Sequence, residues 1–488
     1  MVYKTRQLLL ASTLLIPTLT FAQSPAPSSP DMQNMPGMQM PADQKPPATQ
    51  PHDMQTMPDM KMNKEMPDMQ MDDQGMKSQM QGPTLKLSDL EQMALSRNPT
   101  ISQANANLRA AEGAKRQAGL YPNPTAGYYG DEIRGGSYHS GKQGAFVNQT
   151  IVFGGKLGAA RRTAEQDRLL ALTGIDSQRY RVLTDVRTLY YEALTAQRLV
   201  SLRRQLLILA NDAVQTSYQL GNVGQADRPD VLQSEVEGDQ AKLDLESAQQ
   251  DQQSVWRTLG AVVGNPDLPM SPLEGNLEDI PQLNEQEWMT KLLSESPQVK
   301  SAQQDAERAK ASLVEAKKVS IPDLQISANV SQDNEPLEPT THRVGIVSGA
   351  QIGMQLPIFN HNQGNVERAK ADIERSQQEV QRVQLELRRQ MSTIFRDYGM
   401  ARTSAERYRT SMLPRAQKAY DLYKTSYENM AAAYPQVLIS QRTLFQLQVD
   451  YIRALETVWM NATAIQGYTL SDGLSAPSPL SGGIPPRP

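Results

Sequence analysis

Methionine is the residue type whose spacing points most directly to chemistry. Thirteen of the 23 methionines lie between residues 32 and 80, where steps of 3, 3 and 2 residues occur twice and steps of 3 and 2 once more. Thioether sulfur is a soft ligand that favours soft cations such as Cu(I) and Ag(I), so the repeated spacing predicts metal binding. The candidate ligands are Met32, Met35, Met38, Met40, Met54, Met57, Met60, Met62, Met66, Met69 and Met71.

The segment around these methionines, residues 23–83, is rich in proline, glutamine and aspartate. Such a composition cannot bury a core, so we expect a disordered metal-binding tail. Two other interpretations stay open: a low-complexity spacer, or a sacrificial target for oxidation, since methionine is readily converted to its sulfoxide. We expect no required cofactor, only Cu(I) or Ag(I) bound by this tail.

Residues 1–22 have the composition of an export signal. Lys4 and Arg6 precede an apolar run from Leu8 to Leu19, and Ala22 ends a plausible cleavage sequence. This pattern predicts a signal peptide and an exported mature chain. No later stretch approaches the ~20 apolar residues that a membrane-spanning helix needs, so we expect any membrane crossing to be made by strands.

The overall composition excludes several classes of protein. The absence of cysteine excludes disulfides, thiolate metal sites, a cysteine nucleophile and a lipid anchor on cysteine. Lysine and arginine total 49 against 53 acidic residues, a balance that argues against nucleic-acid binding. We find no recognisable Ser/His/Asp set or paired-carboxylate site and expect that the protein is not an enzyme.

The remainder of the chain repeats itself. Prolines recur 198 residues apart in the first part of each repeat and 206 residues apart further on, in the pairs Pro99 and Pro297, Pro124 and Pro322, and Pro229 and Pro435. Such self-similarity indicates two copies of one structural unit. We predict repeats over 84–264 and 285–470, an equatorial linker over 265–284 and a disordered C-terminal tail over 471–488.

Each repeat predicts the same order: short helix, strand, loop, strand, very long helix, tight turn and long helix. We place the expected strands at 125–133, 145–153, 324–332 and 344–356, and apolar and polar residues alternate in the third and fourth of them. Alternating strands of about ten residues are typical of a transmembrane β-barrel. The pattern alone leaves open a half-buried strand in a soluble sheet.

The long helices carry a coiled-coil pattern. Apolar residues follow alternating steps of 4 and 3 from Val182 to Val214, and a second helical stretch runs from about Gly364 to Met430. Each helix would span about 60 residues, or roughly 90–100 Å.

Four strands cannot close a membrane barrel, whose smallest form has about eight. If the strands span the membrane, protomers must pool them, eight from a dimer or twelve from a trimer, and arithmetic does not choose between the two.

The chain resembles the TolC-like outer-membrane efflux proteins over about residues 85–470. The distinctive segments are NPT and SPQV at the start of each repeat, YPNPTAGYYGDE, FGGKLGAAR, LPIFNHNQG and the turn SYQLGNVGQADRPDVLQSE. The sequence FGGKLGAARR and the methionine-rich prefix are most similar to the heavy-metal branch typified by CzcC and CusC.

The resemblance implies a mixed α+β membrane protein. Its homotrimer would form a twelve-stranded β-barrel in outer-membrane lipid, with four strands per protomer, continued by a coiled-coil α-helical barrel in the periplasm of a Gram-negative bacterium. It also implies docking of the helical tips onto a periplasmic adaptor protein and an inner-membrane pump of the RND type. The docking residues carried over are Tyr218, Gly221, Gly224, Asp230 and Leu232, and Tyr427, Tyr434, Val437 and Leu438.

The second tip departs from the family pattern, because Met430 stands where glycine is expected and the aspartate of the first tip is missing. On this interpretation the chain is the outer-membrane exit channel of a tripartite efflux system that exports Cu(I), Ag(I) or related heavy metals. Two alternatives remain: a channel of the same family for drugs or other organic compounds, and a soluble periplasmic coiled-coil protein that sequesters copper.

Overall fold

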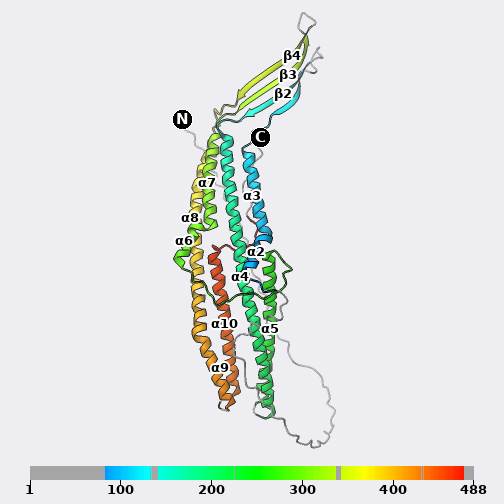
Figure 1. The fold of residues 1–488 in the computed structure, drawn as a ribbon. Helices are drawn as coiled ribbons and strands as arrows, with labels where there is room; N and C mark the ends of the chain where they lie inside the picture. Colours follow the sequence, from blue (N-terminus) through cyan, green and yellow to red (C-terminus); the bar gives the residue numbers. More distant parts are fainter. Residues whose placement is uncertain are drawn as a thin grey trace, which may run out of the picture. The chain divides into compact units, whose positions relative to one another are not determined.

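The computed structural model describes residues 83–131, 133, 141–224, 226–336, 342–429, 431 and 433–477. These residues form long helices and one four-stranded sheet (Figure 1), in agreement with the predicted mixed α+β class. Within these ranges, no helix has both the length and the apolar content needed to cross a membrane. The methionine-rich segment and residues 478–488 lie outside the described residues.

The two halves of the chain share one order of elements, in which a helix pair precedes a strand pair and two long helices follow. The first half consists of α2 (Leu87–Arg97), α3 (Pro99–Ala118), β1 (Thr125–Asp131), β2 (Lys142–Ile151), α4 (Lys156–Asn222) and α5 (Arg228–Val263). The second consists of α6 (Glu285–Glu295), α7 (Pro297–Lys318), β3 (Leu324–Pro336), β4 (Arg343–Met354), α8 (Gln363–Arg407), a π-helical turn (Tyr408–Met412), α9 (Leu413–Glu428) and α10 (Tyr434–Gln466).

Each half begins with two helices where the sequence predicted one short helix. Asn98 ends α2, and its side chain accepts a hydrogen bond from the Thr100 N–H at 2.9 Å, which caps α3. Ser296 caps α7 in the same way by accepting from the Val299 N–H. The residue before a proline avoids the α conformation, so Pro99 and Pro297 fix both breaks.

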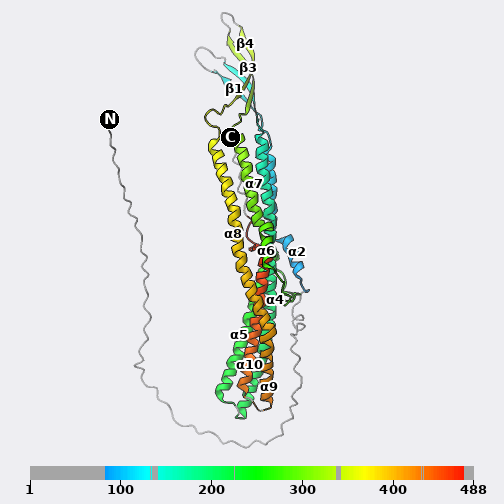
Figure 2. The ribbon, with the colours of Figure 1, turned by 90° about the vertical axis from the view of Figure 1, so that its left-hand side faces the viewer.

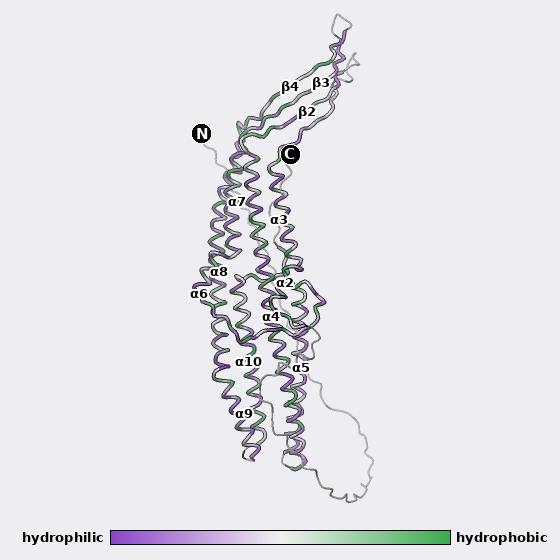
Figure 3. Tube along the Cα trace, viewed as in Figure 1, coloured by the Kyte–Doolittle hydropathy of each residue, from purple (hydrophilic) through white to green (hydrophobic). Residues whose placement is uncertain are grey.

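The sheet is antiparallel, with strand order β1-β2-β3-β4. The central pair joins the two halves of the chain, with Ile151 opposite Leu324. β1 and β3 begin at the predicted residues, Thr125 and Leu324, but β3 continues to Pro336, beyond the predicted end. Apolar and polar residues both occur along β2, β3 and β4 (Figure 3). β1 and β4 are the edges of this sheet among the described strands.

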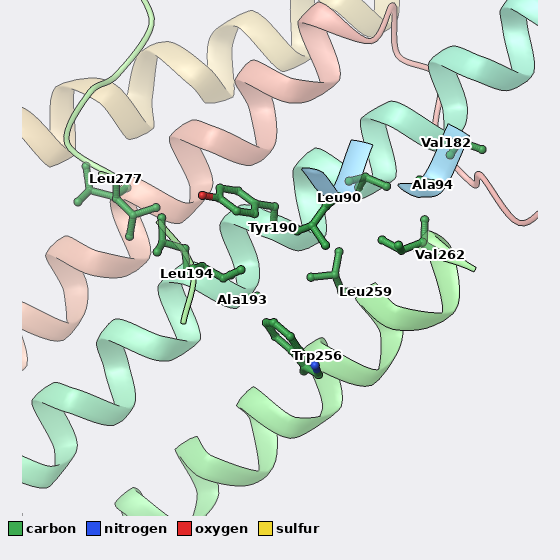
Figure 4. Close-up of a cluster of buried hydrophobic side chains, with 14 of the residues drawn as sticks. Leu90, Ala94, Val182, Tyr190, Ala193, Leu194, Trp256, Leu259, Val262 and Leu277 are labelled. Atoms are coloured by element: carbon green, nitrogen blue, oxygen red, sulfur yellow. The ribbon is translucent and has the colours of Figure 1, made fainter. Parts of the chain in front are cut away.

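The long helices run beside one another, with α4 in contact with α3, α5, α7 and α10 (Figures 1 and 2). The largest buried cluster lies where α2, α4 and α5 meet, and Figure 4 shows Leu90, Tyr190 and Leu259 in it. The predicted seam accounts for part of this packing, because Val182 and Val186 are fully buried. Burial of the seam residues stabilises the pairing of the helices.

The connection between the halves is held by aromatic side chains. The indole N–H of Trp256 donates to the carbonyl oxygen of Leu268 at 2.9 Å, and that of Trp459 donates to Leu277 at 2.8 Å. The Tyr190 hydroxyl donates to the carbonyl of Glu274. Tryptophan and tyrosine that are partly buried commonly use their polar atom in this way. These hydrogen bonds therefore anchor the segment 265–284 to α5, α10 and α4.

The chain after α10 also differs from the expected tail. Gly473 donates its N–H to Asp185 at 2.6 Å and accepts a hydrogen bond from the Thr100 hydroxyl at 2.9 Å. Gln178 donates to the same carbonyl at 3.0 Å. Residues 471–477 are thus attached to α3 and α4 and do not form part of an unstructured tail.

The second long helix is interrupted, whereas the sequence predicted one continuous stretch to about residue 430. A π-helical turn over Tyr408–Met412 separates α8 from α9, and Pro414 follows directly. Proline lacks an N–H donor, and its ring collides with the carbonyl four residues earlier, here that of Thr410. A π-helical turn widens the helix locally and accommodates that ring.

Candidate functional site

The candidate docking residues lie at the two turns farthest from the sheet (Figures 1 and 2). We call residues 214–238, around the turn from α4 to α5, the first tip. We call residues 420–444, around the turn from α9 to α10, the second tip. The two ranges are aligned at the repeat offset of 206 residues. Residues 225, 430 and 432 lie outside the described residues, so Met430 is not placed.

The first tip is a turn with a polar cap. Gly224 has a positive φ of 72°, which favours glycine because it has no Cβ. Asp227 and Asp230 form a capping box at the start of α5, in which the Asp227 N–H donates to the Asp230 carboxylate at 3.4 Å. Carboxylates in this position also favour the positive end of the helix dipole. The cap fixes the direction in which α5 leaves the turn.

The predicted docking residues of the first tip are on the surface. Tyr218, Gly224, Asp230 and Leu232 are exposed, and Gly221 is half-buried. The Tyr218 hydroxyl donates a hydrogen bond to Glu235 on α5, and this bond raises the pKa of Tyr218. Because these groups are accessible, the first tip offers a polar and apolar surface to a partner.

The predicted docking residues of the second tip point largely inward. The rings of Tyr427 and Tyr434 lie 5.1 Å apart at an angle of 48°. Val437 is 6% exposed and packs with Tyr420 and Leu444. Burial raises the pKa of Tyr434 to about 12. This tip is organised around an apolar and aromatic cluster.

Leu438, the last predicted docking residue of the second tip, is half-buried. The start of α10 in this tip lacks a side-chain cap. Ala433 occupies the N-cap position of α10 and supplies no side-chain hydrogen bond. The aspartate cap of the first tip therefore has no equivalent among the described residues of the second.

The structure brings the two tips together through contacts that the sequence did not reveal. Arg442 on α10 forms an ion pair with Glu237 on α5, and the side chains of Thr216 and Tyr434 are hydrogen-bonded. These pairs join helices from different halves of the chain. Their partners depend on the axial register of the helices, which helical periodicity does not specify. No sequence signal identified them.

None of the predicted methionine ligands can be assessed, since residues 32–71 lie outside the described residues. Within the part of the chain that is described, no group of three or more histidine, cysteine, aspartate or glutamate residues could hold a metal ion. The described fold thus presents helical tips and a sheet as its candidate functional surfaces.

Comparison with known proteins identifies the class. The pattern of the family "Outer membrane efflux protein" matches residues 90–265 and 288–467, one segment in each half of the chain. The chain belongs to this family, and its location is accordingly the outer membrane. This location is not consistent with the alternative of a soluble periplasmic protein.

Individual proteins extend the comparison. The chain is 28% identical to the cobalt-zinc-cadmium resistance protein CzcC of Cupriavidus metallidurans over 384 residues, which are 79% of this chain and 89% of CzcC. Its fold is similar to that of VceC from Vibrio cholerae, with a TM-score of 0.65, 18% identity and coverage of 79% and 96%. CusC gives a TM-score of 0.64, 16% identity and coverage of 79% and 92%. The resemblance to CzcC and CusC inferred from sequence is confirmed.

Proposed function

We propose that three copies of this chain form the outer-membrane exit channel of a tripartite efflux system for heavy-metal cations. The observation that carries the proposal is the four-stranded sheet with two edge strands, β1 and β4. Unpaired edges in lipid cost several kcal/mol for each backbone group. Three copies would pair these edges in a twelve-stranded barrel, and the helices below would form the periplasmic conduit.

The proposed partners follow from the tips. The exposed groups of the first tip, Tyr218, Asp230 and Leu232, would dock onto a periplasmic adaptor protein. An inner-membrane pump of the RND type would supply the energy, because the channel itself only provides a path. Tyr427, Tyr434 and Val437 would support docking from beneath the surface by fixing the shape of the second tip.

The proposed cargo is a heavy-metal cation, and two classes compete. The methionine repeats favour Cu(I) and Ag(I), because thioether sulfur is a soft ligand. The name of CzcC refers to resistance to cobalt, zinc and cadmium, and that likeness favours these divalent cations. We favour Cu(I) and Ag(I), for which the tail would hold ions close to the channel.

Growth of a strain that lacks this protein tests the cargo. The strain is grown across copper, silver, cobalt, zinc, cadmium and common drugs. It is complemented with the full-length protein, with a variant that lacks residues 32–80, or with a matched variant in which the methionines of that segment are replaced by glutamine. The glutamine variant keeps the length of the segment and removes its sulfur.

If the strain is sensitive to copper and silver alone, and only the full-length protein restores its growth, the result would support the proposal with its tail. Sensitivity to cobalt, zinc and cadmium would support the channel and replace the cargo. Sensitivity to drugs but not to metals would leave a channel for organic compounds. If full growth in copper returns with the glutamine variant, the tail is a spacer.

A further inference from the structure

A cavity lies between α9 and α10, beside the π-helical turn. Its volume is about 290 Å³, close to the lower limit of about 300 Å³ for small-molecule sites in proteins. Its lining comes from the π-helical turn, α9, α10 and the segment 265–284. A path for cargo through the proposed channel does not explain this cavity.

The cavity marks a break in the packing of the core. Tyr451, Ile452 and Leu444 line it, and each belongs to a different cluster of buried apolar side chains. Leu413 also lines the cavity and packs against two of these clusters without joining them into one. Protein interiors are normally close-packed, so a gap of this size beside buried side chains is uncommon.

The π-helical turn forms one wall of the cavity. Arg409 lies within this turn, and Leu413 and Pro414 follow it directly. Its counterpart in the first half, α4, is a continuous α-helix. Single π-helical turns within α-helices occur frequently at functional sites. The helix interruption and the cavity therefore occur together at one place in the second half.

Gln448 supplies a hydrogen-bond acceptor to the lining. Among the residues that the structure describes, none donates a hydrogen bond to its side-chain oxygen Oε1, although this atom is buried. A buried acceptor without a partner is destabilising, and in most proteins such an atom is paired. An O–H or N–H group of a ligand in the cavity would supply the missing donor.

The other walls define the body of the ligand. Arg409 contributes a guanidinium group, which is attracted to the faces of aromatic rings. Most of the remaining wall is aliphatic and is formed by Leu413, Pro414, Leu444 and Ile452. An apolar aromatic body fits both kinds of surface.

The charges of the lining favour a neutral ligand. Glu278 and Arg409 are its two charged residues, and they have opposite signs. The Glu278 carboxylate already pairs with Arg198 at 3.3 Å and accepts a hydrogen bond from the Tyr451 hydroxyl. The carboxylate is thus engaged by protein groups, and the lining as a whole carries no net charge.

We propose that this cavity binds a small neutral aromatic molecule with one hydroxyl group, such as a phenol or a naphthol. The hydroxyl donates to Oε1 of Gln448, and the rings lie against the aliphatic wall and Arg409. A bound molecule fills the gap between the clusters and stabilises the π-helical turn, because it binds the folded form alone. The inference goes beyond the proposed function, since it concerns a second ligand and is independent of the cargo.

Hydrogen–deuterium exchange of the full-length protein tests the site. Amide exchange is followed over residues 408–417 and 444–452 during titration with naphthol or with naphthalene, which has the same rings but no hydroxyl. Naphthol should slow exchange in both segments. It should also bind about fivefold more tightly than naphthalene at equal free concentration, the ratio expected for one hydrogen bond between neutral groups.

A substitution on the protein tests the same hydrogen bond from the other side. Gln448→Met keeps the length of the side chain and removes the acceptor, so the preference for naphthol over naphthalene should disappear. Gln446→Met makes the same change at an exposed position of α10 and should keep the preference. A preference that persists in Gln448→Met, or is lost equally in Gln446→Met, would overturn the assigned hydrogen bond.

The exchange pattern decides the remaining outcomes. Slower exchange confined to the two segments supports the cavity as the binding site. Equal protection by naphthol and naphthalene in the unaltered protein would overturn a ligand defined by its hydroxyl. Absence of protection by either compound, or protection only in other helices, would overturn the site itself.

Discussion

The two tips differ at two aligned positions of their helices, where the first tip has glycine and the second has a tyrosine and a leucine. Gly221 aligns with Tyr427, and Gly238 aligns with Leu444. A Cβ at Gly238 would lie 3.2 Å from Val214, so α4 and α5 approach closely there. Leu444 is instead buried between the helices of the second tip. One topology is thus maintained by close backbone approach in one half and by a side-chain cluster in the other.

The helices that lead to the tips differ in the same sense. α4 continues without interruption from Lys156 to Asn222, while its counterpart is divided by the π-helical turn before Pro414. The residue of α4 that aligns with Pro414 is Ile208. From this difference we expect a stiffer first tip and a second tip that bends more easily and depends on its core.

Removal of the second tip's core should have the largest effect. Leu444→Ala deletes a side chain that is almost fully buried, and such a change costs about 2–5 kcal/mol. Hydrogen–deuterium exchange should show that the free energy of opening of residues 420–445 falls by this amount. Ile439→Ala, at an exposed position of the same helix, is the control and should change opening by less than about 0.5 kcal/mol.

Introducing a proline into α4 and removing Pro414 from the second half should have the next largest effect. Ile208→Pro, at an exposed position, should lower the local stability of α4 by about 3 kcal/mol, since proline removes a hydrogen bond and collides with the preceding turn. Pro414→Ala should slow amide exchange over residues 408–414 by allowing a continuous α-helix. If Ile208→Pro exchanges no faster than Ile208→Ala, the difference in stiffness between the halves is not due to proline.

The helix caps allow a smaller and reciprocal test. Asp227→Ala should destabilise the start of α5 by about 1 kcal/mol, because the capping box is lost. Ala433→Asp should stabilise the start of α10 by a similar amount, since that N-cap has no side-chain bond. Amide exchange in the first turn of each helix measures both. Effects of equal sign in the two variants would contradict the assigned difference in capping.

The ion pair between the tips should have the smallest effect. Arg442 is 64% exposed in its pair with Glu237, so solvent screens the interaction and its contribution is at most about 1 kcal/mol. A double-mutant cycle with Arg442→Gln and Glu237→Gln should give this coupling, and added salt should reduce it. A coupling well above this value that resists salt would make the ion pair a principal connection between the tips.

The sequence predicted the elements more reliably than their contacts. The starts of β1 and β3 at Thr125 and Leu324 were correct, and for β3 the alternation that predicted it is a local pattern. Seam residues such as Val182 are buried as expected. The π-helical turn was missed although Pro414 was visible, because a proline alone does not specify how a helix adapts to it.

The candidate site was harder to predict. Val437 was selected as a docking residue by resemblance, yet it lies in the buried cluster, because resemblance transfers positions and not exposure. Glu237 and Arg442 were not found, since their pairing depends on the register of helices far apart in the sequence. The metal-binding methionines and the docking residues remain predictions.

The most direct test of the central claim is cross-linking between the two edge strands of different protomers. A cysteine at Gly127 in β1 is combined in turn with a cysteine at each position from Gly345 to Gly353 in β4, in the otherwise cysteine-free full-length protein. Closure of the sheets in a trimer predicts, at the matching register, covalent species that end at three chains. Absence of any cross-link between chains across the whole scan would contradict a barrel shared by protomers.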